Sequence, residues 1–181
     1  MKKVVIAVIL VCSVAAAHAQ KYMTRTGQVS FFSHTPLENI DAINNEVAAI
    51  LDSKTGALIL QVPVKSFKFE RALMEEHFNE NYMESDKYPR ADFNGTVADV
   101  SAVNFAKDGA YKVTVKGKMT MHGVTKEVAV PAVLTVKGKE VTGQAKFSII
   151  PGDYNIKIPS LVENKIAKEI SVSVNSVFQQ K

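Results

Sequence analysis

The sequence contains almost no cysteine. Its 181 residues include a single cysteine, Cys12, which lies in the N-terminal segment. The rest of the chain therefore has no thiol for a disulfide bond or for nucleophilic chemistry. Such a domain has to be stabilised by its hydrophobic core, and a chain of this length is long enough to form one.

A long hydrophobic run is also missing. The most apolar stretch, residues 4–11, follows two lysines and precedes small residues that end in Ala17-His18-Ala19. It is shorter than the roughly 20 residues that span a membrane, and its flanks are typical of a secretory signal peptide. We expect a signal peptide in residues 1–19 and a mature domain in residues 20–181, periplasmic or secreted and without a transmembrane segment. A lipid anchor on Cys12 is the alternative, although Val11 rather than a small residue precedes it.

The mature chain carries little net charge. The full sequence has a formal charge of +4, of which Lys2 and Lys3 belong to the predicted signal peptide, leaving +2. This charge gives no support to a nucleic-acid partner. No linker, internal repeat or long charge run divides the chain, so we expect one domain.

Alternation of apolar and polar residues is what the sequence has in abundance. Between residues 111 and 136 the alternation has a period of two on both sides of a turn at His122-Gly123. This pattern predicts two antiparallel strands with one apolar face. The side chains expected to point inward are Val113, Val115, Met119, Val128, Val130 and Leu134.

Similar signals recur along the chain and predict about eight strands. The further strands are expected in residues 27–35, 45–52, 57–69, 90–100, 139–150 and 169–179. Within 57–69 the apolar parity flips near Lys65-Ser66, which predicts a bulge or a bend. We expect an all-β fold, a meander closed into a barrel or folded into a sandwich, because closure removes exposed sheet edges.

One segment breaks the strand pattern. In residues 70–85, Met74, Phe78 and Tyr82 recur at every fourth position. This spacing predicts an amphipathic helix of about three turns whose apolar side chains pack on the barrel or on its ligand. The side chains expected to stay in solvent are Glu75, Glu76 and Glu80.

The alternation leaves open whether the barrel is filled or hollow. An eight-stranded barrel has an interior that side chains can fill or that holds one small ligand. The inward parity includes the small or flexible residues Gly117, Met119, Met121 and Ala132. Methionine fills irregular gaps in ordinary cores as well as in pockets, so this composition is compatible with either interior.

Three ordered motifs resemble one known family. They are SFKFERALMEEHFNENYMESDKYPRADFNG in residues 66–95, YKVTVKGKMTMHGVTKEVAVPAVLTV in residues 111–136 and FSIIPGDYNIKIP in residues 147–159. Together they span essentially the mature chain, which resembles the YceI-like lipid/polyisoprenoid-binding family. The resemblance implies a lipocalin-like antiparallel barrel in the periplasm, without a cofactor. It also implies an elongated apolar pocket for an isoprenoid, quinone-like or fatty-acyl chain.

With this resemblance, we expect the residues that bind the lipid on the helix and on the inward faces of the strands. His77 is expected on the buried side of the helix, in contact with a lipid headgroup or a backbone carbonyl. Arg90 and Lys126 are placed near the expected openings, where a cation could hold a pyrophosphate or a carboxylate. The candidate ligand-binding residues are Met74, His77, Phe78, Tyr82, Tyr88, Arg90, Phe93, Val115, Gly117, Met119, Met121 and Ala132.

Candidates for catalysis or metal binding are few. His34, His77 and His122 have no spacing that forms a ready metal site. His122 lies at a turn, which favours a hydrogen bond to the backbone over a role at the pocket mouth. We expect a carrier for a small apolar lipid without catalytic residues. Two alternatives stay open, namely a lipid-modifying enzyme with His77 or His122 as general base and a structural protein with a filled barrel. The choice between a monomer and a homodimer also stays open.

Overall fold

The computed structural model describes residues 21–181, so the predicted signal peptide, its cleavage site and Cys12 lie outside the described residues. The strands are β1 (Lys21–His34), β2 (Asn39–Asp52), β3 (Ala57–Pro63), β4 (Lys68–Phe69), β5 (Arg90–Ala98), β6 (Gly109–Met121), β7 (Val124–Lys137), β8 (Glu140–Ile149) and β9 (Ile170–Gln180). The helix α1 (Ala72–His77) continues into a π-helical turn (Phe78–Tyr82). Short 3-10 turns occur at Val64–Ser66, Val100–Ala102, Pro151–Tyr154 and Ser160–Lys165.

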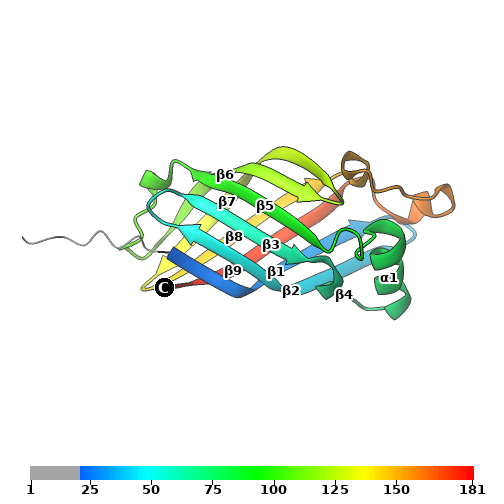
Figure 1. The fold of residues 1–181 in the computed structure, drawn as a ribbon, viewed down its shortest axis with the longest axis horizontal. Helices are drawn as coiled ribbons and strands as arrows, with labels where there is room; N and C mark the ends of the chain where they lie inside the picture. The colour runs from blue at the N-terminus through cyan, green and yellow to red at the C-terminus, as the bar shows by residue number, and fades with distance from the viewer. Residues whose placement is uncertain (1–20) are drawn as a thin grey trace, which may run out of the picture.

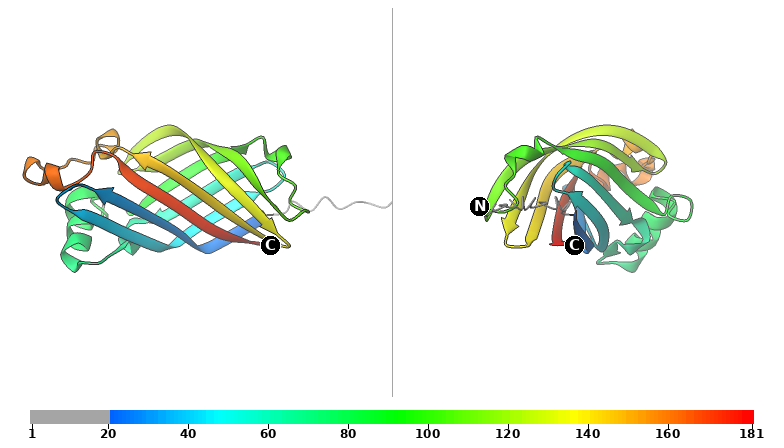
Figure 2. Two further views of the ribbon diagram at one scale, coloured as in Figure 1. Left: turned by 180° about the vertical axis from the view of Figure 1, so that it is seen from behind. Right: turned by 60° about the vertical axis from the view of Figure 1, so that its left-hand side comes forward.

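The strands form a closed antiparallel barrel, which Figure 1 and Figure 2 show from three sides. The order around the barrel is β1-β9-β8-β7-β6-β5-β3-β2, and β1 also pairs with β2, which closes the ring. The two-residue β4 adds a short pairing to β2. The predicted all-β fold with about eight barrel strands and one inserted helix is confirmed.

The β6–β7 hairpin has the predicted turn and register. Met121 pairs with Val124 across a two-residue turn, and both turn residues have positive φ, 50° at His122 and 75° at Gly123. Two consecutive positive φ values define the hairpin turn whose twist matches that of the strands. The six side chains predicted to point inward lie in the barrel interior: five line its cavity, and Val113 packs on a buried core cluster.

The predicted break near Lys65-Ser66 is also present. After β3 the chain makes the 3-10 turn Val64–Ser66 and resumes as β4. The turn shifts the parity, so that Phe67 and Phe69 face the same interior as Leu60 of β3. A strand that changes parity in this way can bend around the barrel without exposing its apolar side chains.

The β7–β8 ladder covers only the part of each strand that lies next to the turn between them. It runs from Lys137↔Glu140 to Ala132↔Ala145, whereas β7 begins at Val124 and β8 ends at Ile149. The next β7 residue is Pro131, which has no N–H to donate to a neighbouring strand. Beyond this point the two strands diverge (Figure 2), and Tyr154 and Ile156 from the segment after β8 pack beside Val124 and Met121.

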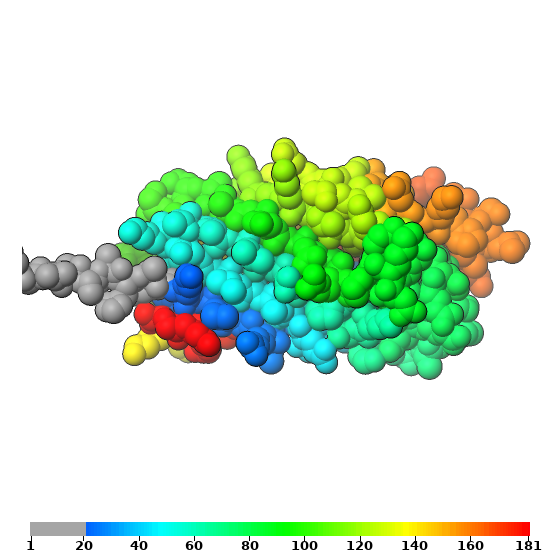
Figure 3. Space-filling model, viewed as in Figure 1, coloured from blue at the N-terminus to red at the C-terminus, as the bar shows by residue number. Residues whose placement is uncertain are grey.

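The two ends of the barrel differ in how they are filled. At the end that carries both termini of the described chain, Tyr22, Leu51, Val141 and Phe178 form a solid core. The β5–β6 connection adds Phe105, whose ring stacks on Tyr22 with a centroid distance of 5.6 Å. At the opposite end lie α1 and residues 151–165 (Figure 3). A hollow interior lies between this end and the solid core. In residues 21–181, no helix is both long enough and apolar enough to cross a membrane.

Candidate ligand-binding site

A cavity of about 560 Å³ occupies the barrel between the filled end and α1. This volume lies within the range of small-molecule sites, roughly 300 to 1,000 Å³. Its walls are overwhelmingly apolar and come from most strands of the barrel. The apolar lining includes Val29, Phe31, Leu60, Val62, Phe67, Phe69, Phe93, Val97, Val115, Met119, Val128, Val130, Ala132, Leu134, Phe147, Val172 and Val174. An interior filled throughout, one of the alternatives from the sequence, is therefore not what the structure contains.

The structure brings nine of the twelve candidate residues together around this cavity. They are Met74, His77, Phe78, Tyr82, Phe93, Val115, Met119, Met121 and Ala132. The lining does not include the other three candidates, Tyr88, Arg90 and Gly117. Each of these three has a different surrounding.

An aromatic cluster attaches the helical segment to the barrel. Phe78 packs against Phe31 of β1, Phe67 and Phe69, with ring centroids 5.1 to 5.5 Å apart. All four rings line the cavity. Aromatic pairs at such distances stabilise beyond the burial of their area, so the predicted packing of the helix on the barrel is confirmed.

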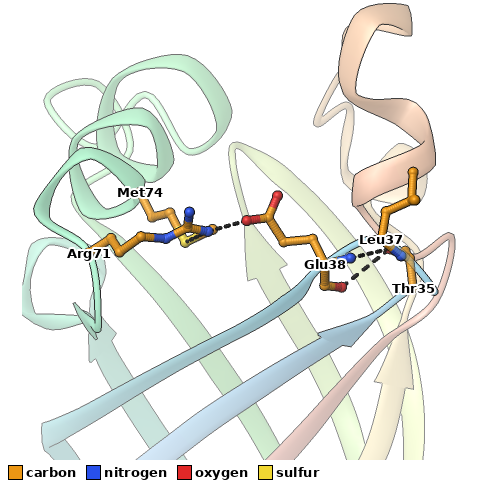
Figure 4. A network of polar contacts seen from close by, with 5 residues as sticks. All are labelled: Thr35, Leu37, Glu38, Arg71 and Met74. Atoms are coloured by element: carbon orange, nitrogen blue, oxygen red, sulfur yellow. Dashed lines mark hydrogen bonds and ion pairs between the residues drawn. The ribbon is translucent and has the colours of Figure 1, made fainter.

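An ion pair connects α1 to the β1–β2 turn at the cavity mouth (Figure 4). Arg71, the residue before α1, binds the Glu38 carboxylate, and its Nη2 also lies 3.3 Å from Met74 Sδ. Thr35 in the same turn accepts hydrogen bonds from the N–H groups of Leu37 and Glu38. Arg71, Glu38 and Met74 all line the cavity, so this ion pair fixes the helix relative to the turn across the opening.

The rim of the mouth carries three exposed apolar side chains. Leu37 in the β1–β2 turn, Leu73 in α1 and Leu161 in the 3-10 turn Ser160–Lys165 are 64%, 60% and 90% exposed. The other exposed large apolar residues of the described chain reach at most 46%. The three most exposed apolar side chains therefore come from three separate segments around one opening.

His77 is the first candidate whose predicted environment needs correction. The sequence predicts it on the buried side of the helix, but its side chain is exposed, although it borders the cavity mouth. His77 and the 60% exposed Leu73 lie four residues apart on one face of α1, whereas Phe78 packs on the barrel from the neighbouring face. Glu75 differs in the opposite sense: it is half-buried and binds Lys68 Nζ at 2.7 Å, whereas Glu76 and Glu80 are exposed as predicted.

Tyr88 contacts the β6–β7 turn instead of the cavity. Its ring meets His122 edge-on at a centroid distance of 4.6 Å and covers Gly123. His122 is buried, with Nδ1 3.0 Å from the carbonyl oxygen of Tyr154 and Nε2 2.8 Å from Glu84. The predicted hydrogen bond from this turn histidine to the backbone is confirmed, and the side chain is not part of the cavity lining.

The two cations that the sequence places near an opening also lie elsewhere. Arg90 is exposed at the start of β5, where its parity is opposite to that of the inward residues Ala91 and Phe93. Lys126 lies on the same face of β7 as Val124 and Val128, but its Nζ binds Asp153 at 3.1 Å and lies 5.9 Å from the centroid of the Tyr154 ring. Neither residue lines the cavity.

Gly117 faces the interior but is covered. A Cβ at this position would lie 2.4 Å from Gly95 Cα and 2.9 Å from the Phe93 ring. The glycine pair therefore leaves room for the ring of Phe93, and it is Phe93 that lines the cavity. Gly117 therefore contributes to the cavity wall by leaving room for this aromatic side chain.

Several lining residues are missing from the candidates that the sequence suggested, some because they leave no signal in it and others although the strand pattern includes them. Glu38 and Arg71 are surface-type residues 33 positions apart, and the barrel closure brings them together. Phe31 follows from the parity of β1, and Ser176 from the parity of Val172 and Val174, so the strand pattern could have identified both. Burial raises the pKa of the Tyr82 phenol above its ordinary value. In residues 21–181, no group of three or more His, Cys, Asp or Glu residues could hold a metal ion.

A closed eight-stranded barrel around an apolar cavity defines the lipocalin-like class of proteins. The model of the YceI-like domain matches residues 13–178, and the chain belongs to this family.

Solved structures share this fold at low sequence identity. A polyisoprenoid binding domain from Saccharophagus degradans, implicated in plant cell wall breakdown, has a TM-score of 0.78 at 14% identity, with 89% of this chain and 98% of that chain covered. BcnA from Burkholderia cenocepacia has a TM-score of 0.69 at 18% identity, covering 84% and 95%. The Campylobacter jejuni YceI protein has a TM-score of 0.62 at 15% identity, covering 82% and 89%. No curated protein matches the chain.

Proposed function

We propose that this protein is a periplasmic carrier or buffer that binds one apolar chain inside the barrel without transforming it. The chain is an isoprenoid, quinone-like or fatty-acyl one. The apolar cavity with a single filled end carries this proposal. The S. degradans domain of the same fold, named for polyisoprenoid binding, supports it, and the predicted signal peptide supports the location.

The cavity volume indicates the size of the cargo. At roughly 30 Å³ for each water-sized group, 560 Å³ accommodates on the order of 20 non-hydrogen atoms. This corresponds to a long fatty-acyl chain or about four isoprene units. Each buried methylene stabilises the complex by about 0.8 kcal/mol, so apolar contact alone can provide tight binding.

The charges around the mouth favour a neutral cargo. The segments that surround it, residues 35–38, 68–82 and 160–165, carry three cations and six anions, a net charge of −3 with histidine neutral. The cations are Lys68, Arg71 and Lys165, and the anions are Glu38, Glu70, Glu75, Glu76, Glu80 and Glu163. Two of the three cations are already paired, Lys68 with Glu75 and Arg71 with Glu38. An anionic headgroup would meet repulsion here, whereas an uncharged one would not.

The positions of the histidines favour binding over catalysis. A general base has to lie within about 3 Å of the proton that it takes. His122 has hydrogen-bond partners at both ring nitrogens and is not part of the lining, and His77 is exposed at the rim. The apolar interior offers neither of them a buried reaction centre.

The proposal is tested by lipid extraction and native mass spectrometry of the purified protein. We expect one apolar molecule for each chain. Ala132→Phe projects a ring from β7 into the cavity and should abolish the bound lipid while circular dichroism shows an intact barrel. Ala129→Phe is the matched control, because Ala129 is exposed on the same strand. If Ala132→Phe retained the same lipid in the same amount, the barrel interior would not be the binding site.

A further inference from the structure

The mouth of the cavity has three sides. They are α1 with the residue before it, the β1–β2 turn, and residues 158–166, and each contributes side chains to the lining. The second and third sides are joined inside the fold, because the N–H of Ala167 donates at 2.8 Å to the hydroxyl of Ser33, a buried residue of β1 just before the turn. The α1 side is joined to them in a different way.

A single ion pair crosses from the α1 side to the other two sides. Within residues 21–181, the Arg71–Glu38 pair is the one hydrogen bond or ion pair between residues 70–82 and the rest of the mouth. Figure 4 shows the two side chains extending toward each other, Arg71 from the beginning of α1 and Glu38 from the turn. Both belong to the cavity lining. The pair therefore closes part of the opening, and a molecule that passes between α1 and the turn has to displace it.

The backbone on both sides of this pair is fixed, whereas the side chains are not. Phe69, two residues before Arg71, pairs with Ala42 of β2, and Phe78 packs into the aromatic cluster at the other end of α1. The side chains of Arg71 and Glu38 are 58% and 22% exposed. An ion pair with such exposure contributes little stability and is screened by salt, so it can separate without a movement of the helix.

We infer that the gap between α1 and the β1–β2 turn is the portal through which the cargo enters and leaves, and that the Arg71–Glu38 pair is its gate. This inference rests on the proposed carrier function and specifies the route of exchange. The exposed apolar side chains of Leu73 in α1 and Leu37 in the turn belong to the two sides that the pair connects. Such a gate changes the rates of entry and release by the same factor and leaves the amount of cargo bound at equilibrium unchanged.

The test follows the exchange of bound 1-hexadecanol for its perdeuterated form by native mass spectrometry, with both alcohols supplied from methyl-β-cyclodextrin. Glu38→Met removes the ion pair but keeps a side chain of similar length. We expect exchange to be about two- to fivefold faster, the value of an exposed ion pair, with an unchanged amount of alcohol bound at equilibrium. Raising the sodium chloride concentration from about 0.05 to 0.5 M should accelerate exchange in the wild type and not in this variant, because salt screens the pair.

The chain offers a closely matched control. Lys68 Nζ binds Glu75 at 2.7 Å with side-chain exposures of 66% and 26%, close to those of Arg71 and Glu38, but neither residue lines the cavity. Glu75→Met should therefore leave the exchange rate and its salt dependence at the wild-type level. The double variant Glu38→Arg/Arg71→Glu reverses the pair and should return the exchange rate towards that of the wild type.

The outcomes separate the gate from the carrier function. Exchange at the wild-type rate in Glu38→Met, equal acceleration in Glu75→Met, or a reversed pair that does not slow exchange would overturn the inference and leave the carrier function intact. A changed amount of bound alcohol at an unchanged exchange rate would do the same, because the pair would then act on affinity. A wild-type protein that takes up no 1-hexadecanol would overturn the carrier function, and this inference with it.

Discussion

Gly95 of β5 and Gly117 of β6 are direct partners in the sheet, and the ring of Phe93 lies against both of them. A Cβ on either glycine would come within 3.0 Å of the backbone of the other strand as well as of that ring. Each glycine therefore leaves room for a bulky neighbour. A pair of small residues on the inner face of a barrel can thus produce a filled wall instead of a hollow.

The first prediction is that Gly117→Ala destabilises the fold by about 1 to 3 kcal/mol, the usual cost of overpacking a tightly packed interior. Urea unfolding measures the change. Gly152→Ala is the control, because no atom lies within 4 Å of a Cβ at that position. Equal stability of the two variants would show that both Phe93 and the backbone of β5 can move away without cost. Gly117→Phe is for the same reason unsuitable for narrowing the cavity, and Ala132→Phe is the informative substitution.

Alternation in the sequence predicted the strands and the inward face because these depend on neighbours along the chain, and it left the choice between a barrel and a sandwich open. The same parity rule places Arg90 outside and Ser176 inside, so both could be read from their strands. The Arg71–Glu38 pair could not, because it depends on how the barrel closes. The same holds for Tyr88, which contacts a turn more than 30 residues further along the chain. Contacts between loops are set by the assembled fold and leave no periodic signal.

The second prediction concerns the acid stability of the β2–β3 turn. Asp52 accepts hydrogen bonds from the backbone N–H groups of Thr55 and Lys54, both at 2.9 Å, and the bond from Thr55 in particular lowers the pKa of this carboxyl. A lowered pKa in the fold means that the carboxylate stabilises it above the ordinary pKa of about 4. This stabilisation is lost as the pH falls through the lower value of the folded state.

Asp52→Asn keeps an oxygen acceptor for the turn but cannot titrate. Urea midpoints between pH 2 and 7 should therefore fall less steeply below pH 4 in this variant than in the wild type. Asp41→Asn, at an exposed position of the same strand, serves as the control. An unchanged slope in Asp52→Asn would show that the turn hydrogen bonds do not couple to acid unfolding.

The third prediction is that Phe78 holds the helical segment on the barrel. Phe78→Asp would place a carboxylate among Phe31, Phe67 and Phe69, without a cation in the cluster. Burying an unpaired charge costs several kcal/mol, so we expect a large loss of stability and of bound lipid. Ala72→Asp adds the same charge at an exposed position of α1 and should change stability by less than about 0.5 kcal/mol. Normal stability and normal lipid content of Phe78→Asp would mean that the helix is peripheral to the cavity.

The last prediction separates a structural role of His122 from a catalytic one. His122 donates from Nδ1 to the Tyr154 carbonyl and faces Glu84 through Nε2, so it connects the β6–β7 turn to the segments after α1 and after β8. Its φ is +50°, a conformation that asparagine tolerates better than most residues. His122→Asn therefore keeps the turn while removing the contact to Glu84. We expect a loss of about 1 to 3 kcal/mol, the cost of leaving buried polar groups unpaired.

A double-mutant cycle with Glu84→Gln isolates the contribution of the pair. Residues in direct contact usually couple by about 0.5 kcal/mol or more, and the half-exposed Glu84 places this pair near the lower end of that range. The amount of bound lipid should stay at the wild-type level in both single variants, because neither side chain lines the cavity. If His122→Asn were as stable as the wild type but carried a chemically different lipid, the residue would act on the cargo, and the protein would be an enzyme instead of a carrier.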